Sequence, residues 1–315
     1  AFDGCTSLKR ISIPEKCTTI EENAFTGAEI LEISGSIKTI PSNTFKNCIS
    51  LKEVVLCDNI TTIKASAFEG CTKLTKIQIS SNCNSIEQNV FNGIENLTIV
   101  GSLDKIPSNV FKNCKSLKSI IINAPIKTIE DSTFEGCDNL SKIVLPQQIE
   151  SIGNKGIDGR DLEIGFIDGI NQIPNAILRG YESIKKVVIP NSVQKIGAEA
   201  LKDCKNLVEV SIPKSVKTIE GNVFVNCGST ITFSGDMCDI PPNSFIGCTS
   251  ERIIFTNPIN VVGDNAFQGI ERSFEVCFEK DVKEIRQSSF RGCKDLTISG
   301  NVNSIGTNAF RGNGA

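Results

Sequence analysis

The sequence predicts a solenoid of stacked, similar rungs, and two observations carry this prediction. A Phe, or an aliphatic residue in its place, returns every 20 to 23 residues along the whole 315-residue chain. Leu, Ile and Val also stand at nearly constant distances before the anchors that follow Phe2. A unit this short cannot bury its apolar face alone, so neighbouring units must share one continuous core. The anchors are Phe2, Phe25, Phe45, Phe68, Phe91, Phe111, Phe134, Ile157, Leu178, Leu201, Phe224, Phe245, Phe267, Phe290 and Phe310.

The first element of a rung is expected to be a short β-strand. Within residues 45–68, Leu51, Val54 and Leu56 follow the spacing L-x-x-V-x-L. Successive side chains of a strand point to opposite faces, so we expect Val54 and Leu56 in the core and Val55 on the outside. The strands of successive rungs then form one parallel sheet.

The second half of a rung returns the chain to the next strand. We expect Ile60 and Ile63 to point into the core and Phe68 to fill it from the opposite side. Gly70 can adopt a positive φ and make the turn into the next rung. This pattern predicts a leucine-rich-repeat solenoid, with a curved parallel β-sheet on the concave side. Turns and short 3₁₀ or irregular segments would form the convex side.

The chain is expected to be a single solenoid domain over residues 1–315, with about fourteen to fifteen rungs. Steps of 20 or 21 residues recur at every third interval, which predicts rungs grouped in triplets of about 66 residues. Duplication of a three-rung block would produce this pattern. Both ends of the sequence fall inside a rung and lack the polar cap typical of terminal repeats. We therefore expect a segment of a longer array.

The composition argues against most catalytic chemistry. The chain has no histidine, which removes His-based acid–base catalysis, Ser-His and Cys-His nucleophilic pairs, and the commonest zinc ligand. The net charge of −3 gives no basic surface for nucleic acid. No apolar run approaches the ~20 residues that cross a membrane. The sequence thus predicts no enzyme, no cofactor, no metal site, no nucleic-acid partner and no membrane insertion of this segment.

Most of the cysteines follow the repeat. Nine of the fourteen stand three residues after an anchor, where Ala28, Ile94 and Ile270 stand in other rungs. The position therefore suits a small or medium apolar side chain, and we expect a ladder of buried, mainly free thiols. Disulfides between neighbouring rungs and a zinc cluster are the alternatives. The nine are Cys5, Cys48, Cys71, Cys114, Cys137, Cys204, Cys227, Cys248 and Cys293.

The repeated pattern resembles that of a known family. Residues 204–226 follow the rung C-x-x-L-x-x-I-x-I-P-x-x-V-x-x-I-x-x-x-A-F-x-G almost position by position. Through this rung the chain resembles the BspA-like, Treponema-type leucine-rich-repeat family over its whole length. The resemblance implies the solenoid fold and no catalytic residues. It also implies a surface or secreted protein that takes part in adhesion to host proteins or to other cells.

The outward strand positions indicate where a protein partner would bind. A β-branched aliphatic residue recurs at one place of each triplet, at Val55, Ile121, Val188 and Ile254. We expect these four in one column of the concave sheet, about 14 Å apart, as an apolar row for an elongated or repetitive protein. The alternative is an inherited preference of sheet surfaces for β-branched residues.

The stretch 153–183 is the least regular part of the array. Its anchor is Ile157, Arg160 stands at the usual Cys position, and Tyr181, the only Tyr, takes that position in the next rung. Arg160 and Tyr181 are further candidates for partner contact, because Arg and Tyr are common at interface hot spots. Simple divergence of one block is the alternative.

We expect the function to be non-enzymatic protein–protein interaction, with cell adhesion or host-protein binding at the cell surface or after secretion. Self-association is a further option. The alternative is an intracellular structural scaffold or assembly protein. Free thiols favour that alternative, because they persist in a reducing cytoplasm.

Overall fold

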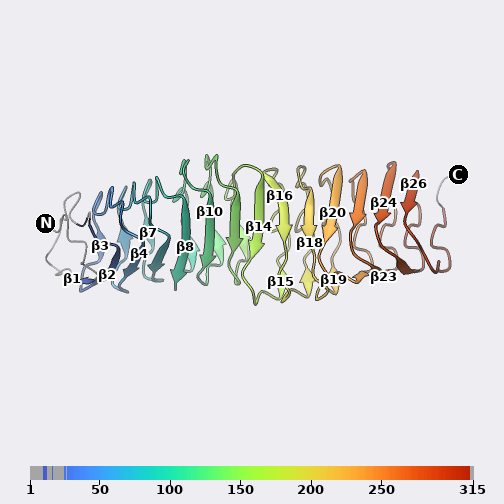
Figure 1. Cartoon of the computed structure of the whole chain (residues 1–315), viewed down its shortest axis with the longest axis horizontal. Helices are drawn as coiled ribbons and strands as arrows, with labels where there is room; N and C mark the ends of the chain where they lie inside the picture. The colour runs from blue at the N-terminus through green and yellow to red at the C-terminus, as the bar shows by residue number, and fades with distance from the viewer. Residues whose placement is uncertain (1–9, 13–15, 17–24, 26, 313–315) are drawn as a thin grey trace. The chain divides into compact units, whose positions relative to one another are not determined.

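The computed structural model describes residues 10–12, 16, 25 and 27–312, which form strands and hydrogen-bonded turns (Figure 1). This described part of the chain contains no helix. The chain divides into two compact units, Ala1–Leu162 (unit 1) and Glu163–Ala315 (unit 2), each a stack of rungs. The prediction of a leucine-rich-repeat solenoid with a parallel sheet is confirmed. The predicted anchor Phe2 and the ladder residue Cys5 lie outside the described residues.

In unit 1 the predicted strands form a parallel sheet, the main sheet, in chain order. Each strand pairs with the strand one rung away, in the order β1-β2-β4-β6-β8-β10-β12. Val54 and Leu56 are buried and Val55 is half-buried, as the alternation predicted. The strands are β1 (Arg10–Ser12), β2 (Ile30–Ser34), β4 (Glu53–Leu56), β6 (Lys76–Ile79), β8 (Asn96–Gly101), β10 (Ser119–Asn123) and β12 (Lys142–Leu145).

Unit 2 repeats this arrangement. Its main-sheet strands follow the order β14-β16-β18-β20-β22-β24-β26, and the pairs from β16 onward are parallel. The strands are β14 (Leu162–Phe166), β16 (Ile184–Val188), β18 (Glu209–Ser211), β20 (Thr230–Ser234), β22 (Arg252–Phe255), β24 (Phe274–Phe278) and β26 (Leu296–Ser299).

A second layer of short strands was not expected from the sequence. The predicted core residue Ile63 is buried, but it also lies in a two-residue strand that pairs with the neighbouring rungs. Unit 1 contains two such three-stranded sheets, β3-β5-β7 and β9-β11-β13, and unit 2 contains β15-β17-β19 and β21-β23-β25. In unit 1 the strands are β3 (Thr39–Ile40), β5 (Thr62–Ile63), β7 (Ser85–Ile86), β9 (Lys105–Ile106), β11 (Thr128–Ile129) and β13 (Ser151–Ile152). In unit 2 they are β15 (Gln172–Ile173), β17 (Lys195–Ile196), β19 (Thr218–Ile219), β21 (Asp239–Ile240), β23 (Ile259–Val262) and β25 (Val282–Ile285).

A third hydrogen-bond ladder holds the turns that carry the anchors. The backbone N–H of Phe45 donates to the carbonyl of Ala67 at 2.8 Å, and that of Asn47 donates to Glu69 at 2.8 Å. The residues two before and two after most anchors have positive φ, for example 60° at Asn47 and 75° at Gly70. Gly and Asn tolerate this conformation best, so the predicted turn at Gly70 is confirmed and Asn fills many equivalent places.

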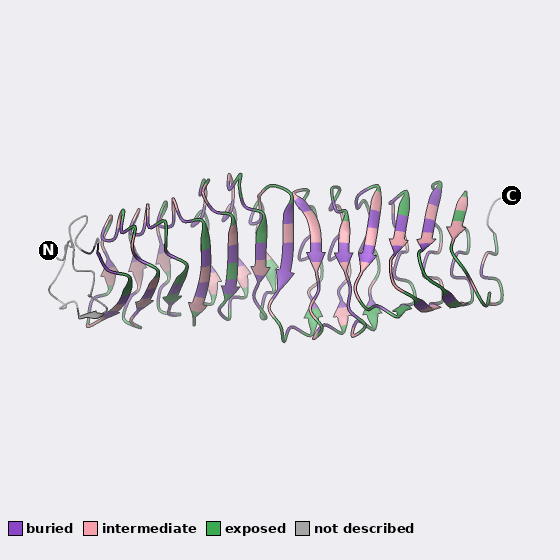
Figure 2. Cartoon of the chain, viewed as in Figure 1, coloured by how far each residue is buried: buried purple, intermediate pink, exposed green. Residues whose placement is uncertain are grey.

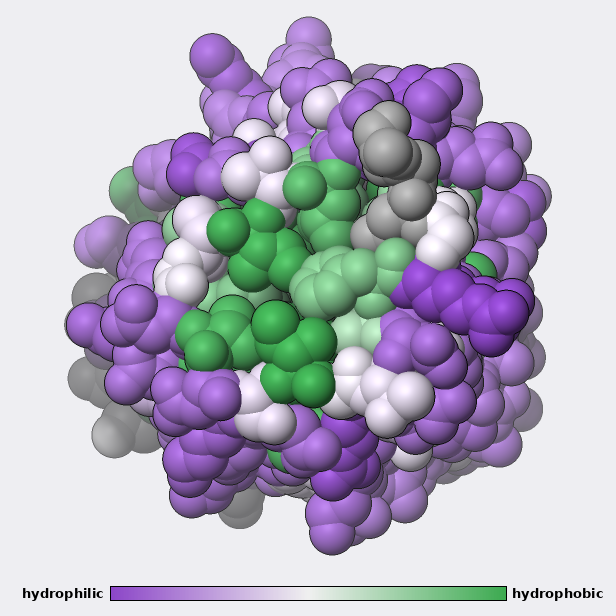
Figure 3. Space-filling view, turned by 90° about the vertical axis from the view of Figure 1, so that its right-hand side faces the viewer, coloured by the Kyte–Doolittle hydropathy of each residue, from purple (hydrophilic) through white to green (hydrophobic). Residues whose placement is uncertain are grey.

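The anchors form the centre of the core. In unit 1 the rings from Phe45 to Phe134 stack with centroids 5.1–6.2 Å apart, and the Phe25 ring lies tilted against Phe45 at 5.2 Å. In unit 2 the rings from Phe224 to Phe310 stack at 4.7–5.5 Å. Figure 2 shows that buried and more exposed residues alternate along the strands. An end-on view of unit 2 shows apolar side chains at the centre of the rung and hydrophilic ones at its rim (Figure 3).

Candidate partner-binding surface

The outer face of the main sheet consists of the strand side chains that alternate with the buried ones. Val55, Val188 and Ile254 are half-buried on this face, and the Ile121 side chain is 38% exposed. All four predicted contact residues therefore reach solvent in their own unit.

The hydrogen-bond register shows that the predicted column is wrong. In unit 1, Gln78 of β6 pairs with Val100 of β8, where the anchor spacing had placed Thr98. In unit 2, Ser211 of β18 pairs with Ser234 of β20 instead of Thr232. We call a rung whose strand lies within a 20- or 21-residue step between anchors a short rung. The strand of a short rung is displaced by two residues relative to the strand before it.

The cause of the displacement lies in the turn before the strand. Thr98 on β8 follows its preceding anchor Phe91 by seven residues, whereas Gln78 on β6 follows Phe68 by ten. The shorter turn makes β8 enter the sheet at a different position along its sequence from β6. At the far end of β8 the chain passes so close to β6 that a Cβ on Gly101 would lie 2.2 Å from the Ile79 carbonyl oxygen. Gly101 also has a φ of 108°, which side chains disfavour. A glycine at the end of the strand was the signal in the sequence that could have revealed the displacement. The glycines at or just after the strand ends of short rungs that have positive φ are Gly35, Gly101, Gly169, Gly235 and Gly300.

The predicted contact residues therefore do not share one row. The row that contains Val55 continues through Gln78 and Val100 to Asn123. Ile121 lies two residues, or about 7 Å, from that row. In unit 2, Ile254 pairs with Thr232 and is displaced from the row of Val188 in the same way.

The register instead assembles a compact patch in unit 1. Thr98, Ile121 and Val144 lie directly opposite one another on β8, β10 and β12. Val100 lies two residues along β8 on the same face, and all four side chains are β-branched, uncharged and at least partly exposed. We call these four residues the unit 1 patch.

A related patch lies in unit 2. Thr232, Ile254 and Cys277 face one another on β20, β22 and β24, and all three are half-buried. We call them the unit 2 patch. The adjacent outward row is charged, since Arg252 bonds Glu275 with an Nε–Oε2 distance of 2.9 Å. Exposed pairs of this kind add little stability, so their main effect is to border an apolar patch with a neutralised polar rim.

The structure places Arg160 and Tyr181 in the connections that lead into β14 and β16, outside the strands of the main sheet. The Arg160 backbone N–H donates to the Leu140 carbonyl at 2.9 Å, and its side chain is exposed. Tyr181 is half-buried, and its backbone carbonyl accepts a hydrogen bond from Ile184 at 3.3 Å. The two residues belong to different units, so each stays a separate prediction of partner contact.

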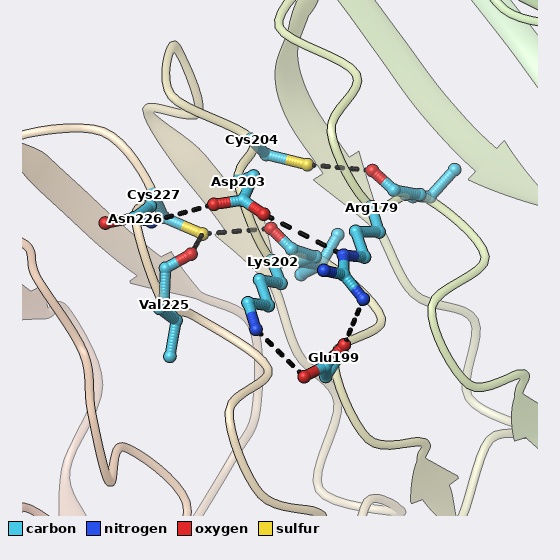
Figure 4. Close-up of polar contacts among 10 residues, drawn as sticks. Arg179, Glu199, Lys202, Asp203, Cys204, Val225, Asn226 and Cys227 are labelled. Atoms are coloured by element: carbon cyan, nitrogen blue, oxygen red, sulfur yellow. Dashed lines mark hydrogen bonds and ion pairs between the residues drawn. The ribbon is translucent and has the colours of Figure 1, made fainter. Parts of the chain in front are cut away.

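The predicted thiol ladder is present and has a hydrogen-bonding role that the sequence did not indicate. Its eight described members are buried. The thiols of Cys204 and Cys227 donate to the backbone carbonyls of Leu178 and Leu201, each at 3.1 Å (Figure 4). Burial raises the pKa of Cys204 to about 12, so this thiol is neutral and unreactive near pH 7. The twelve described cysteines are free.

A cluster of charges lies on the turns beside this ladder. Arg179 bonds Glu199 with an Nη1–Oε2 distance of 2.6 Å and approaches Asp203 with an Nε–Oδ2 distance of 3.8 Å (Figure 4). Lys202 bonds the other Glu199 oxygen at 2.9 Å, and this hydrogen bond is the main reason why the pKa of Glu199 is lowered. Glu199 is therefore held between two cations, and Asp203 lies at the edge of the same ion-pair cluster.

The described residues offer no metal centre, because no three His, Cys, Asp or Glu side chains among them gather closely enough to bind an ion. Within the same part of the chain, no helix has the length and apolar character needed to cross a membrane.

Comparison with known proteins identifies the repeat. The family model for the BspA type leucine rich repeat region matches residues 1–98, 104–230 and 194–314. No curated protein is significantly similar to the chain.

Solved structures with similar rungs include two bacterial proteins. A leucine-rich repeat protein from Bacteroides ovatus is 26% identical, with a TM-score of 0.41, and the match covers 99% of this chain and 78% of that protein. A leucine rich cell surface protein from Faecalibacterium prausnitzii is 21% identical, with a TM-score of 0.28, and the match covers 72% of this chain and 88% of that protein.

Proposed function

The chain belongs to the BspA-type leucine-rich-repeat family, and from this premise we propose that it acts in adhesion, at a cell surface or after secretion, by binding a protein on the outer face of its main sheet. Repeats of this family imply a protein-interaction module. The family is in general a non-enzymatic scaffold, and the raised thiol pKa and paired carboxylates described above fit a non-enzymatic role.

The single observation that carries the proposal is the unit 1 patch. Ile121 is exposed in the middle of it, with Thr98 and Val144 directly opposite on the neighbouring strands. A hydrogen-bonded parallel sheet holds these short, branched side chains in place, so little conformational entropy is lost when a partner covers them. An uncharged patch with a polar border is the usual composition of a protein-binding surface.

The test replaces the β-branched aliphatic residues of the two patches by Thr, namely Val100, Ile121 and Val144 in unit 1 and Ile254 in unit 2. This change keeps the branched shape and the strand preference. We expect unchanged unfolding in urea and about tenfold weaker binding, because the apolar centre of the contact is lost. Binding is measured by surface plasmon resonance against a panel of purified extracellular-matrix proteins and against the protein itself.

The matched control replaces two polar residues of the same outer face, Gln78 and Ser211, by Thr, and should bind like the parent. A variant with only the three unit 1 changes and a variant with only Ile254→Thr show which unit carries the contact. If the quadruple variant binds like the parent while Arg160→Ala or Tyr181→Ala abolishes binding, the contact lies on the turns and the outer face is not the site.

A second candidate function is an intracellular scaffold, and the free thiols favour it. Twelve described cysteines are unpaired, as is usual for proteins of reducing compartments. Antibody labelling of intact and permeabilised cells separates the two functions. Labelling that requires permeabilisation would support the scaffold and contradict the surface role.

A further inference from the structure

One rung boundary of unit 1 is left open on its turn side. At neighbouring boundaries of unit 1 the N–H groups of the anchors Phe45, Phe68 and Phe111 donate to carbonyls of the next rung, as Phe45 donates to Ala67. At the boundary between the anchors Phe91 and Phe111, the described residues form none of these bonds. The unbonded N–H groups are those of Asn89, Phe91 and Gly93, and the facing unbonded carbonyls are those of Ser108, Val110 and Lys112.

The same boundary interrupts the second layer, because β7 ends one three-stranded sheet and β9 begins the next. A groove of about 630 Å³ opens here, and we call it the seam groove. The Phe91 and Phe111 rings still stack at 5.1 Å, so the core beneath the groove is closed. The boundary lies within the 20-residue step from Phe91 to Phe111. The step from Phe290 to Phe310 is equally short but keeps its turn ladder, since the Phe290 N–H donates to the Ala309 carbonyl at 2.9 Å.

The lining of the seam groove is polar but carries no unpaired charge. Its two charged residues are neutralised, since Glu87 pairs with Lys64 at 3.1 Å and Lys112 pairs with Glu135 at 3.0 Å. The half-buried Ala65 supplies an apolar contact, and Ile86 beside it is 7% exposed. Neutral side chains that both donate and accept hydrogen bonds form the rest of the rim; they are Gln88, Asn89, Ser108, Asn109 and Asn113, all exposed.

We propose that the seam groove binds a neutral carbohydrate. A hydroxyl group accepts from an N–H and donates to a carbonyl, so it bridges facing groups such as those of Asn89 and Ser108 that are left unbonded. A sugar presents several hydroxyls on a small ring whose apolar face can rest on Ala65, which is half-buried in the lining. An anion fits less well, because the only cation in the lining is already paired and Glu87 repels it. The volume lies in the usual range of small-ligand sites.

Unit 2 contains an internal comparison. At the boundary of Phe224 and Phe245, the second layer is interrupted in the same way, between β19 and β21. The rim there is different, because Gly221 stands in the place of Gln88, Pro242 in that of Ser108 and Gly247 in that of Asn113. A carbohydrate should therefore bind in unit 1 and not at this boundary.

The experiment records amide NMR spectra of the full chain during titration with glucose, galactose, N-acetylglucosamine and maltotriose. We expect saturable shifts of the Gln88 and Asn113 side-chain amides with at least one sugar. Gln88→Ala should weaken binding about threefold to tenfold, as loss of one neutral hydrogen bond does. Gln287→Ala is the matched control, because Gln287 also stands three residues before an anchor and is exposed, but lies in unit 2.

Four results would overturn the proposal. The first is no saturable shift with any of the sugars, which would mean that only water fills the groove. The second is saturable binding of acetate or phosphate, titrated in parallel, in place of sugars. The third is full binding by Gln88→Ala, and the fourth is an equal loss in Gln287→Ala. Resonances outside residues 85–113 report that each variant keeps the parent fold.

Discussion

Phe111→Ala is expected to remove one ring from the middle of the aromatic stack of unit 1. The Phe111 side chain is fully buried, and its ring centroid lies 5.1 Å from those of Phe91 and Phe134. Truncation of a buried Phe to Ala costs about 3–5 kcal/mol of unfolding free energy. Phe134 stacks on an aromatic ring on one side only, because the next anchor is the aliphatic Ile157. Phe134→Ala should therefore lower the unfolding free energy by about 0.5–1.5 kcal/mol less than Phe111→Ala does, which is the value of one aromatic contact.

Urea unfolding combined with hydrogen exchange tests this reasoning. Each rung contacts only its neighbours, so exchange should increase first in the rungs next to Phe111 and later in distant rungs of unit 1. Phe111→Leu is the matched control, since Leu178 and Leu201 are buried anchors in this chain; it should cost about 1.5 kcal/mol or less. A cost below about 1.5 kcal/mol for Phe111→Ala, or a uniform increase in exchange, would refute the stacked-anchor account.

Three further predictions concern the register and the thiols. Gly101→Ala should lower the unfolding free energy by at least about 1–2 kcal/mol, because the new Cβ meets a carbonyl oxygen at positive φ; Gly221→Ala, with nothing within 4 Å, should be nearly neutral in the same urea titration. Iodoacetamide at pH 8 should label the exposed Cys238 quickly and the buried Cys137 only on unfolding, and mass spectrometry of native protein would contradict this if both labelled at one rate. Burial raises the pKa of Cys137 from 9.0 to about 12, so the folded state keeps this thiol protonated more strongly than the unfolded state does. The unfolding free energy should therefore be unaffected by this thiol below pH 9 and should fall as the pH rises towards 12. An unfolding free energy that stays constant over this interval would exclude the effect.

Much of the rung could be predicted from local spacing alone. The distance from Val54 to Leu56 sets which side chains enter the core, and the interval between anchors sets the size of a rung. The position of Cys204 three residues after Leu201 indicated a small buried side chain, and the structure confirms it. These inferences held because alternation along a strand and burial of an apolar side chain depend on residues close in sequence.

The outer face could be predicted only in part. Exposure of Ile121 followed from its alternation with buried neighbours, and the structure confirms it. Its alignment with Val55 did not follow, because the prediction assumed that rungs superpose from one anchor to the next. The hydroxyl-binding geometry proposed for the seam groove was also invisible in the sequence, although the Asn residues that line it also serve as turn formers at positive φ.

The sequence by itself determined the repeat, the inward and outward faces, the stacked anchors and the buried thiols, since each depends on spacing within one rung. The tertiary structure alone decided which residues lie opposite one another across the sheet, where the second layer is interrupted and where the seam groove opens. The physical reason is that register depends on where two strands enter the sheet relative to each other. That relation is set by the turns of two rungs together, and three residues missing from one turn displace the strand by two residues.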